Sequence, residues 1–179
     1  MTKHEHHLTV ELPAFVESRL HEPFAWGTND CATFAADSIQ TITGVDIADE
    51  FRGKYKTKIG ALKLIKKITG GSTIADVAVY CAEKHGLREY EHPLMAKRGD
   101  LVLVRNGDGD EIAGIVALNG RHVMSPGDKG IVPLPILSIT RAWNVGDTHA
   151  WTPPKWHKYH PDNIQVEDTS LPTLPATTN

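Results

Sequence analysis

Apolar residues in the first half of the chain recur every three or four positions, which is the spacing of one face of an α-helix. Proline stands in the first turn of the first such segment, and glycine follows each of the other three, where a C-terminal cap is expected. The pattern therefore predicts four helices. They cover residues 13–20, 31–43, 59–69 and 74–85.

From about residue 100 the pattern changes to short runs rich in β-branched residues, separated by Asn-Gly, Asp-Gly and Pro-Gly turn signals. Helices followed by consecutive strands indicate an α+β fold. We expect the helix that begins at Cys31 to pack on an antiparallel sheet of about five strands. The predicted strands cover residues 101–105, 112–118, 121–124, 130–133 and 139–145.

The distribution of polar residues and prolines divides the chain into three parts. Residues 1–12 are polar and are expected to form a flexible N-terminus, and residues 13–147 form the α+β domain. Residues 148–179 contain five prolines and no periodic apolar pattern, so they cannot bury a core of their own. We expect an extended arm that binds neighbouring proteins in an assembly.

Charge and composition exclude several classes of protein. The net charge of −3 provides no overall field for nucleic acid, and no apolar run approaches the roughly 18 residues of a membrane span. The N-terminus has no apolar signal core, so synthesis in the cytoplasm is expected. Cys31 and Cys81 are too few for a disulfide framework or a four-cysteine zinc site, and we expect no metal or cofactor.

One basic segment departs from this balance. Seven lysines and arginines, and no acidic residue, lie from Arg52 to Lys67. Such a run is either a solvated helix face or a contact surface for phosphates or an acidic partner. The histidines of the segment HEHH, residues 4–7, have no partner pattern and indicate a polar terminus rather than a metal site.

Cys31 is the candidate with chemical consequences. It follows the turn and cap residues Gly27, Thr28, Asn29 and Asp30, and therefore stands in the first turn of its helix. The helix dipole and the unpaired N–H groups there favour a thiolate, which is the reactive form of cysteine. The alternative is a small apolar residue that packs the start of the helix against the sheet.

Four segments carry a resemblance to a known family. They are FAWGTNDCA (24–32), with its WG-x-x-DC element, GDLVLV (99–104), IAGIVALNG (112–120) and RHVMSPG (121–127). Together they resemble the NlpC-type branch of the papain superfamily, whose members usually cleave peptidoglycan stem peptides. The resemblance covers about residues 13–145, and it implies a papain-like fold with Cys31 in the position of the nucleophile.

Finer features are closer to an uncharacterised subgroup of that branch, which occurs in phages and prophages near tail genes. These features are the segments LPAFVESRL, PFAWGTNDCATFAADS, FRGKYKT and RAWNV. The resemblance implies a virion protein, placed in the phage tail or tail tip. Other virion proteins would then be the partners of residues 148–179.

The chain departs from the family at its second catalytic position. Ile112 stands where the base should begin the hairpin strand, and Met124 stands at the third polar position. A cysteine nucleophile needs an imidazole, and isoleucine cannot replace one. His122 shares a strand face with Met124, so it could form an unusual dyad with Cys31, although an exposed histidine at a strand edge is the simpler interpretation. His21 and His149 are further candidates from loops.

Three functions follow from these observations. The first is a virion structural protein built on a degenerate peptidase domain, in which Cys31 is a relic. The second is an active cysteine endopeptidase that cleaves peptidoglycan stem peptides during genome entry, with Cys31 and His122 as catalytic residues. The third is a non-catalytic module that binds cell-wall peptide, without cutting it, in the cleft that corresponds to the active site of the peptidase family. Ile112 at the base position favours the first over the second.

Overall fold

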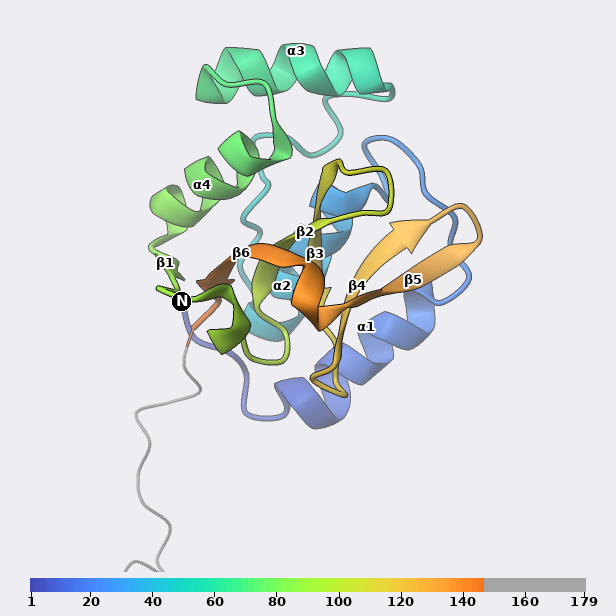
Figure 1. Cartoon of the computed structure of the whole chain (residues 1–179), viewed down its shortest axis with the longest axis vertical. Coiled ribbons are helices and arrows are strands. Elements are labelled where there is room, and N and C mark those ends of the chain that lie inside the picture. Colours follow the sequence, from blue (N-terminus) through green and yellow to red (C-terminus); the bar gives the residue numbers. More distant parts are fainter. Residues whose placement is uncertain (147–179) are drawn as a thin grey trace, which may run out of the picture. The chain divides into compact units, whose positions relative to one another are not determined.

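A computed structural model describes residues 1–146 and confirms the α+β class, with four α-helices and a six-stranded antiparallel sheet (Figure 1). The sheet order is β1-β6-β2-β3-β4-β5. The helices are α1 (Leu12–Arg19), α2 (Cys31–Thr43), α3 (Lys58–Thr69) and α4 (Ile74–His85). The strands are β1 (Arg88–Glu89), β2 (Leu101–Arg105), β3 (Glu111–Val116), β4 (His122–Gly127), β5 (Gly130–Pro135) and β6 (Ile139–Asn144).

Local sequence accounts for where most of these elements begin and end. Asp30 and Thr33 form a capping box at the start of α2, and Thr73 and Asp76 form another at the start of α4. Helices α2, α3 and α4 each end at a glycine in the left-handed conformation, as the sequence predicts. The five predicted strands are present, β2 with the predicted ends and the others with at least one shifted end. Strand β1 is a short additional strand that pairs with β6.

The central strands β2 and β3 are covered on both faces of the sheet. One face packs against α2 and α4 in the larger core, with Leu101, Leu103 and Ile115 facing the helices. The opposite face carries Val102 and Val116, which pack in a second, smaller core. Alternate residues of β2 and β3 therefore belong to different cores, as the two-residue repeat of a strand requires.

The N-terminus differs from the flexible segment that we expected over residues 1–12. Lys3 is almost fully buried, and its ammonium lies 2.6 Å from the carboxylate of Asp100, which has no exposed surface. His7 is buried in a short π-helical turn, His7–Glu11, and Leu12 is part of the core. The physical reason is that a buried carboxylate is costly unless a cation accompanies it, and the polar N-terminal segment supplies that cation.

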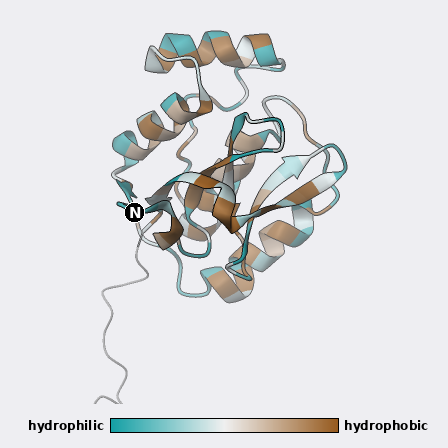
Figure 2. Cartoon of the chain, viewed as in Figure 1, coloured by the Kyte–Doolittle hydropathy of each residue, from teal (hydrophilic) through white to brown (hydrophobic). Residues whose placement is uncertain are grey.

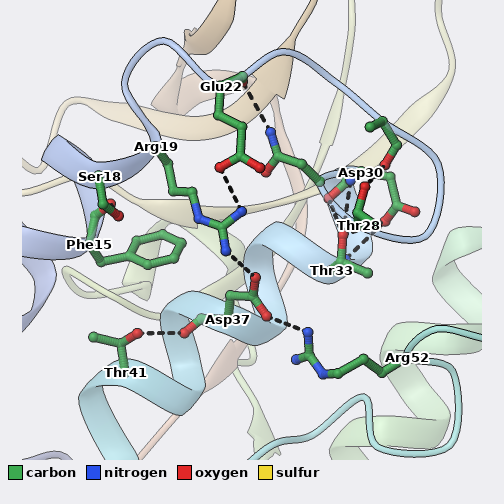
Figure 3. A network of polar contacts seen from close by, with 12 residues as sticks. Phe15, Ser18, Arg19, Glu22, Thr28, Asp30, Thr33, Asp37, Thr41 and Arg52 are labelled. Atoms are coloured by element: carbon green, nitrogen blue, oxygen red, sulfur yellow. Dashed lines mark hydrogen bonds and ion pairs between the residues drawn. The ribbon is translucent and has the colours of Figure 1, made fainter.

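The loop before α3 is held to α1 and α2 by a network of ion pairs (Figure 3). Asp37 on α2 accepts from Arg19 at 2.8 Å and from Arg52 at 2.5 Å. Arg19 also contacts Glu22, and Arg52 makes a second, two-pronged contact with Asp46. The guanidinium of Arg52 lowers the pKa of Asp46, chiefly through its hydrogen bonds.

We expect Arg52→Ala to lower the free energy of unfolding by about 2 kcal/mol, because Asp37 loses one charge-assisted bond and Asp46 loses two. The folded pKa of Asp46 is depressed, so this stabilisation is complete above the unfolded pKa and is lost as the pH falls through the folded value. In urea unfolding, the difference from wild type should therefore shrink below about pH 4.

The matched control for this variant is Arg88→Ala, which removes an exposed arginine of β1. It should change the free energy of unfolding by less than about 0.5 kcal/mol. Equal effects of the two substitutions, or a loss for Arg52→Ala that stayed constant at acidic pH, would contradict a stabilising role for the network.

Candidate functional site

A cleft of about 600 Å³ opens between α2, the α3–α4 pair and the hairpin formed by β2 and β3. Its lining is mostly apolar, with alanine, leucine, isoleucine and valine from the helices and aromatic side chains from the loops on either side of α2. Cys31 lies in this cleft at the first position of α2, as the sequence predicts. Phe24 and Trp26 also line it, in contact with each other edge to face. A pocket of this size and character is typical of a small-molecule site.

The loop before Cys31 is held in place by the buried carboxylate of Asp30. That carboxylate accepts hydrogen bonds from the backbone N–H of Gly27 at 2.7 Å and of Thr33 at 2.9 Å (Figure 3 shows the bond to Thr33). It also accepts from the hydroxyl of Tyr55 at 2.6 Å. Burial, together with the Asp30 charge, raises the pKa of Tyr55, so its hydroxyl remains a donor at neutral pH. Asp30 therefore holds the loop before Cys31 in place.

Gly27, in the WG element, is required by both conformation and space. Its φ is +78°, and a Cβ atom added there would lie 1.9 Å from the carbonyl oxygen of Tyr55. The neighbouring Asn29 is buried and donates from its side-chain amide to the carbonyls of Glu22 and Pro23, both at 3.0 Å. The WG-x-x-DC element thus fixes a tight loop around the start of α2.

The surroundings of Cys31 keep its thiol protonated. Burial raises the pKa of Cys31 to about 11, and the charge of Asp30 adds to that effect. Hydrogen bonds with the backbone of Ala113 and Ala32 act in the opposite direction, but they do not compensate for burial. The dipole of α2 therefore does not produce a thiolate at neutral pH, and no histidine among residues 1–146 lines the cleft to stabilise one.

The strand that should carry the base, β3, contains no histidine to place next to Cys31. Ile112 reaches the rim of the cleft but packs mainly against the second core, on the face of the sheet away from α2. The next residue, Ala113, lies on the face of the sheet toward α2, and its backbone forms a hydrogen bond with the Cys31 thiol. Ser125 on β4 donates to the Ala113 carbonyl at 2.9 Å, which ties the two strands together beside the thiol. Met124, at the third polar position, is buried in the main core.

His122 is not brought to Cys31. The ring Nδ1 of His122 lies 2.9 Å from the side-chain amide of Asn119, in the turn between β3 and β4. Ser125 and Pro126 are the residues of β4 that line the cleft. His122 lies three positions before Ser125, a distance of about 10 Å along the strand. His21 does not line the cleft either, and His149 lies outside the described residues. Within residues 1–146, no histidine contributes to the cleft.

The structural roles of two polar residues could not be predicted from the sequence, although both residues stand in segments that carry the resemblance. Asp100, the acid of GDLV, accepts from Lys3, from the Tyr90 hydroxyl and from two backbone N–H groups. Tyr55, in the segment FRGKYKT, bonds to Asp30 from 25 residues away. The motifs were visible in the sequence, but the partners that explain them are too distant along the chain to be recognised.

The described part of the chain gives no sign of a metal centre or of a transmembrane helix. No group of three or more metal-binding side chains occurs within residues 1–146. None of the helices in that range combines the length and the apolar character of a membrane span. The cleft is therefore the site from which a function can be argued.

Comparison with known proteins identifies one family. Its model, described as a domain of unknown function (DUF6950), matches residues 3–145, which is nearly the whole described domain. No curated protein and no solved structure matches the chain.

Proposed function

The chain belongs to the DUF6950 family, and we propose that it is a phage or prophage virion protein of the tail or tail tip, with an NlpC-like domain that does not hydrolyse peptides. The observation that carries the proposal is the state of Cys31. Its thiol lies in an apolar cleft with a pKa raised to about 11. A cysteine peptidase needs a thiolate and an imidazole that protonates the leaving amine, and the cleft lining from residues 1–146 offers no imidazole.

The virion location is supported by the resemblance of the segments LPAFVESRL, PFAWGTNDCATFAADS, FRGKYKT and RAWNV to a tail-associated phage subgroup. The proline-rich segment 148–179 lies outside the described residues, and its composition suits an arm that binds neighbouring virion proteins. Mass spectrometry of purified particles tests the location directly. Absence of the protein from particles that contain the other tail proteins would contradict it.

Cys31 should react slowly with iodoacetamide at neutral pH. A pKa of about 11 leaves roughly one thiol in ten thousand ionised at pH 7, so alkylation should be about a hundredfold slower than for an exposed cysteine. The rate should rise tenfold per pH unit up to at least pH 10, because the thiolate is the reacting species. In a Cys81→Ala variant Cys31 is the remaining cysteine, so intact-mass spectrometry measures the alkylation of Cys31 alone. The purified protein should also leave peptidoglycan uncut.

The His122→Ala variant separates this proposal from the endopeptidase. The ring of His122 contacts Asn119 rather than the cleft, so the substitution should leave the alkylation profile of Cys31 unchanged. Fast alkylation near pH 6 that disappeared in His122→Ala would reveal a working dyad and overturn the non-catalytic assignment.

The cleft itself favours a second candidate, a module that binds cell-wall peptide without cutting it. Its volume of about 600 Å³ accommodates a short peptide, and the start of α2 lies at its wall. Binding of purified stem peptide to the Cys31→Ala variant, measured by calorimetry, tests this candidate without any contribution from catalysis.

A further inference from the structure

Helix α3 is weakly anchored to the rest of the domain. It lies at the opposite end of the domain from α1, beyond α4 (Figure 1), and Ala61 is its only fully buried residue. Leu64, Ile65 and Ile68 are only partly buried where they pack against the main core. Ile65 and Leu62 also line the cleft, and the side chain of Leu62 remains 42% exposed. Apolar and polar residues alternate along the helix (Figure 2). Helix α3 is therefore an amphipathic wall of the cleft whose apolar side is only partly covered.

The interior of the cleft is open because many of its lining residues are small. Alanines project from α2, α3 and α4 at positions where a packed core usually carries leucine or isoleucine, and Ile47, Val77 and Leu101 complete the wall. Protein interiors contain few voids larger than a water molecule, so an apolar cleft of about 600 Å³ has the size and lining of a ligand site. The alanines are Ala32, Ala35 and Ala36 on α2, Ala61 on α3 and Ala78 on α4.

The same wall of the cleft is strongly basic on its solvent side. Lys58 lines the cleft mouth at the start of α3, and Lys54, Lys56 and Lys63 are exposed nearby. Arg52, by contrast, is engaged by Asp37 and Asp46. The segment 52–67 contains no acidic residue to neutralise these lysines, so a negative charge at the mouth of the cleft would be attracted to them. The acidic groups of the opposite rim, Asp110 and Glu111, stand on the β2–β3 hairpin, and Glu111 accepts a hydrogen bond from Thr140.

From these features we propose that the cleft binds an anionic amphiphile: a linear acyl chain lies among the aliphatic side chains, and its anionic head group meets Lys58 at the mouth. The inference rests on the proposed non-catalytic role of the same cleft. A chain of ten to fourteen carbons, either free as a fatty acid or as part of a membrane lipid, has the chemistry that the apolar interior and Lys58 require. Removing the chain from water supplies the affinity, and the lysine fixes its direction.

The test is calorimetric titration of the full chain with dodecanoate below its micelle concentration, compared with butyrate, which has the same head group and a short chain. Dodecanoate should bind at least about a hundredfold more tightly than butyrate, because eight more methylene groups are buried at least in part. Equal affinities for the two acids would overturn the proposal.

Two matched pairs of variants on α3 locate the binding. Leu62→Ala removes a cleft-lining side chain and should weaken dodecanoate binding about fivefold to tenfold, whereas Ile59→Ala, at a residue that is 67% exposed and outside the lining, should not. Lys58→Glu should weaken binding at low salt about fivefold, with a smaller effect of Lys63→Glu on the solvent face. Equal effects within either pair would contradict the assignment to the cleft.

Vesicles distinguish the two sources of the ligand. If the protein binds free dodecanoate and also co-sediments with phosphatidylglycerol vesicles, the ligand is a membrane lipid. If it binds dodecanoate without co-sedimenting, the ligand is a free acid. Either outcome supports the proposal that the cleft binds an anionic amphiphile. Binding of an acidic aliphatic peptide in place of both would overturn it. Failure of dodecanoate to bind while Cys31 alkylates slowly would leave the non-catalytic proposal intact, whereas fast alkylation at neutral pH would remove that proposal itself.

Discussion

Replacing Asp100 by alanine should destabilise the domain by about 3–5 kcal/mol, because it leaves the ammonium of Lys3 buried without its partner. Lys3 is 4% exposed and Asp100 is 0% exposed, so water cannot replace the lost contact without opening the structure. The substitution also removes the acceptor for the Tyr90 hydroxyl and for the backbone N–H of Val145. A loss of this size is a large fraction of the stability of a typical domain.

Denaturant unfolding of the variant measures this loss, and Asp108→Ala is the matched control. Asp108 lies exposed in the turn between β2 and β3, so its removal should change the free energy of unfolding by less than about 0.5 kcal/mol. Adding Lys3→Met to Asp100→Ala should restore part of the lost stability, because the unpaired charge is removed with its partner. A stability within about 1 kcal/mol of wild type for Asp100→Ala alone would show that the pair is not buried in solution.

The ends of the helices were predictable because short-range chemistry determines them. Asp30 and Thr33 lie three residues apart, and Gly44, Gly70 and Gly86 each follow a periodic apolar segment. Such signals need no knowledge of the tertiary structure. The position of Cys31 at the start of α2 was predictable for the same reason, and the structure confirms it.

What depends on distant parts of the chain was not predictable. The N-terminal segment is polar, and only the carboxylate of Asp100, 97 residues away, explains why Lys3 is buried. Strand β1 has two exposed residues, too few for a two-residue repeat to be visible, and it exists because β6 offers an edge. Contacts with residues distant along the chain determine both features, and a local sequence pattern carries no information about those contacts.

The candidate site shows the same division. The sequence places Cys31 at the start of α2, as the structure has it, but it cannot show that Ile112 packs mainly against the second core while Ala113 faces the thiol. Nor can it show that His122 turns toward Asn119. The cleft itself depends on the distance at which α3 and α4 lie from α2, which is a property of packing between helices and carries no periodic signal.

Gly27→Ala should also destabilise the domain strongly, by about 3 kcal/mol or more, through the loop that presents Cys31. The substituted residue would need φ near +78°, which costs a residue with a Cβ about 1–2 kcal/mol. Its Cβ would also lie 1.9 Å from the Tyr55 carbonyl oxygen, so the backbone at Tyr55 must move. That movement disturbs the hydrogen bond from the Tyr55 hydroxyl to Asp30.

Gly53→Ala separates these two costs. Gly53 has a similar φ of +71°, but no atom lies within 4 Å of the position that its Cβ would take. It should therefore lose only the conformational part, about 1–2 kcal/mol, in thermal or denaturant unfolding. The additional loss of stability in Gly27→Ala, compared with Gly53→Ala, measures the close approach of Tyr55 to the WG loop.

The Gly27→Ala variant should also alkylate faster at Cys31, because a displaced loop admits water to the thiol and lowers its pKa toward the ordinary value. Equal stability losses at the two glycines would show that the WG element is not held against Tyr55, and that the geometry around Cys31 has another origin.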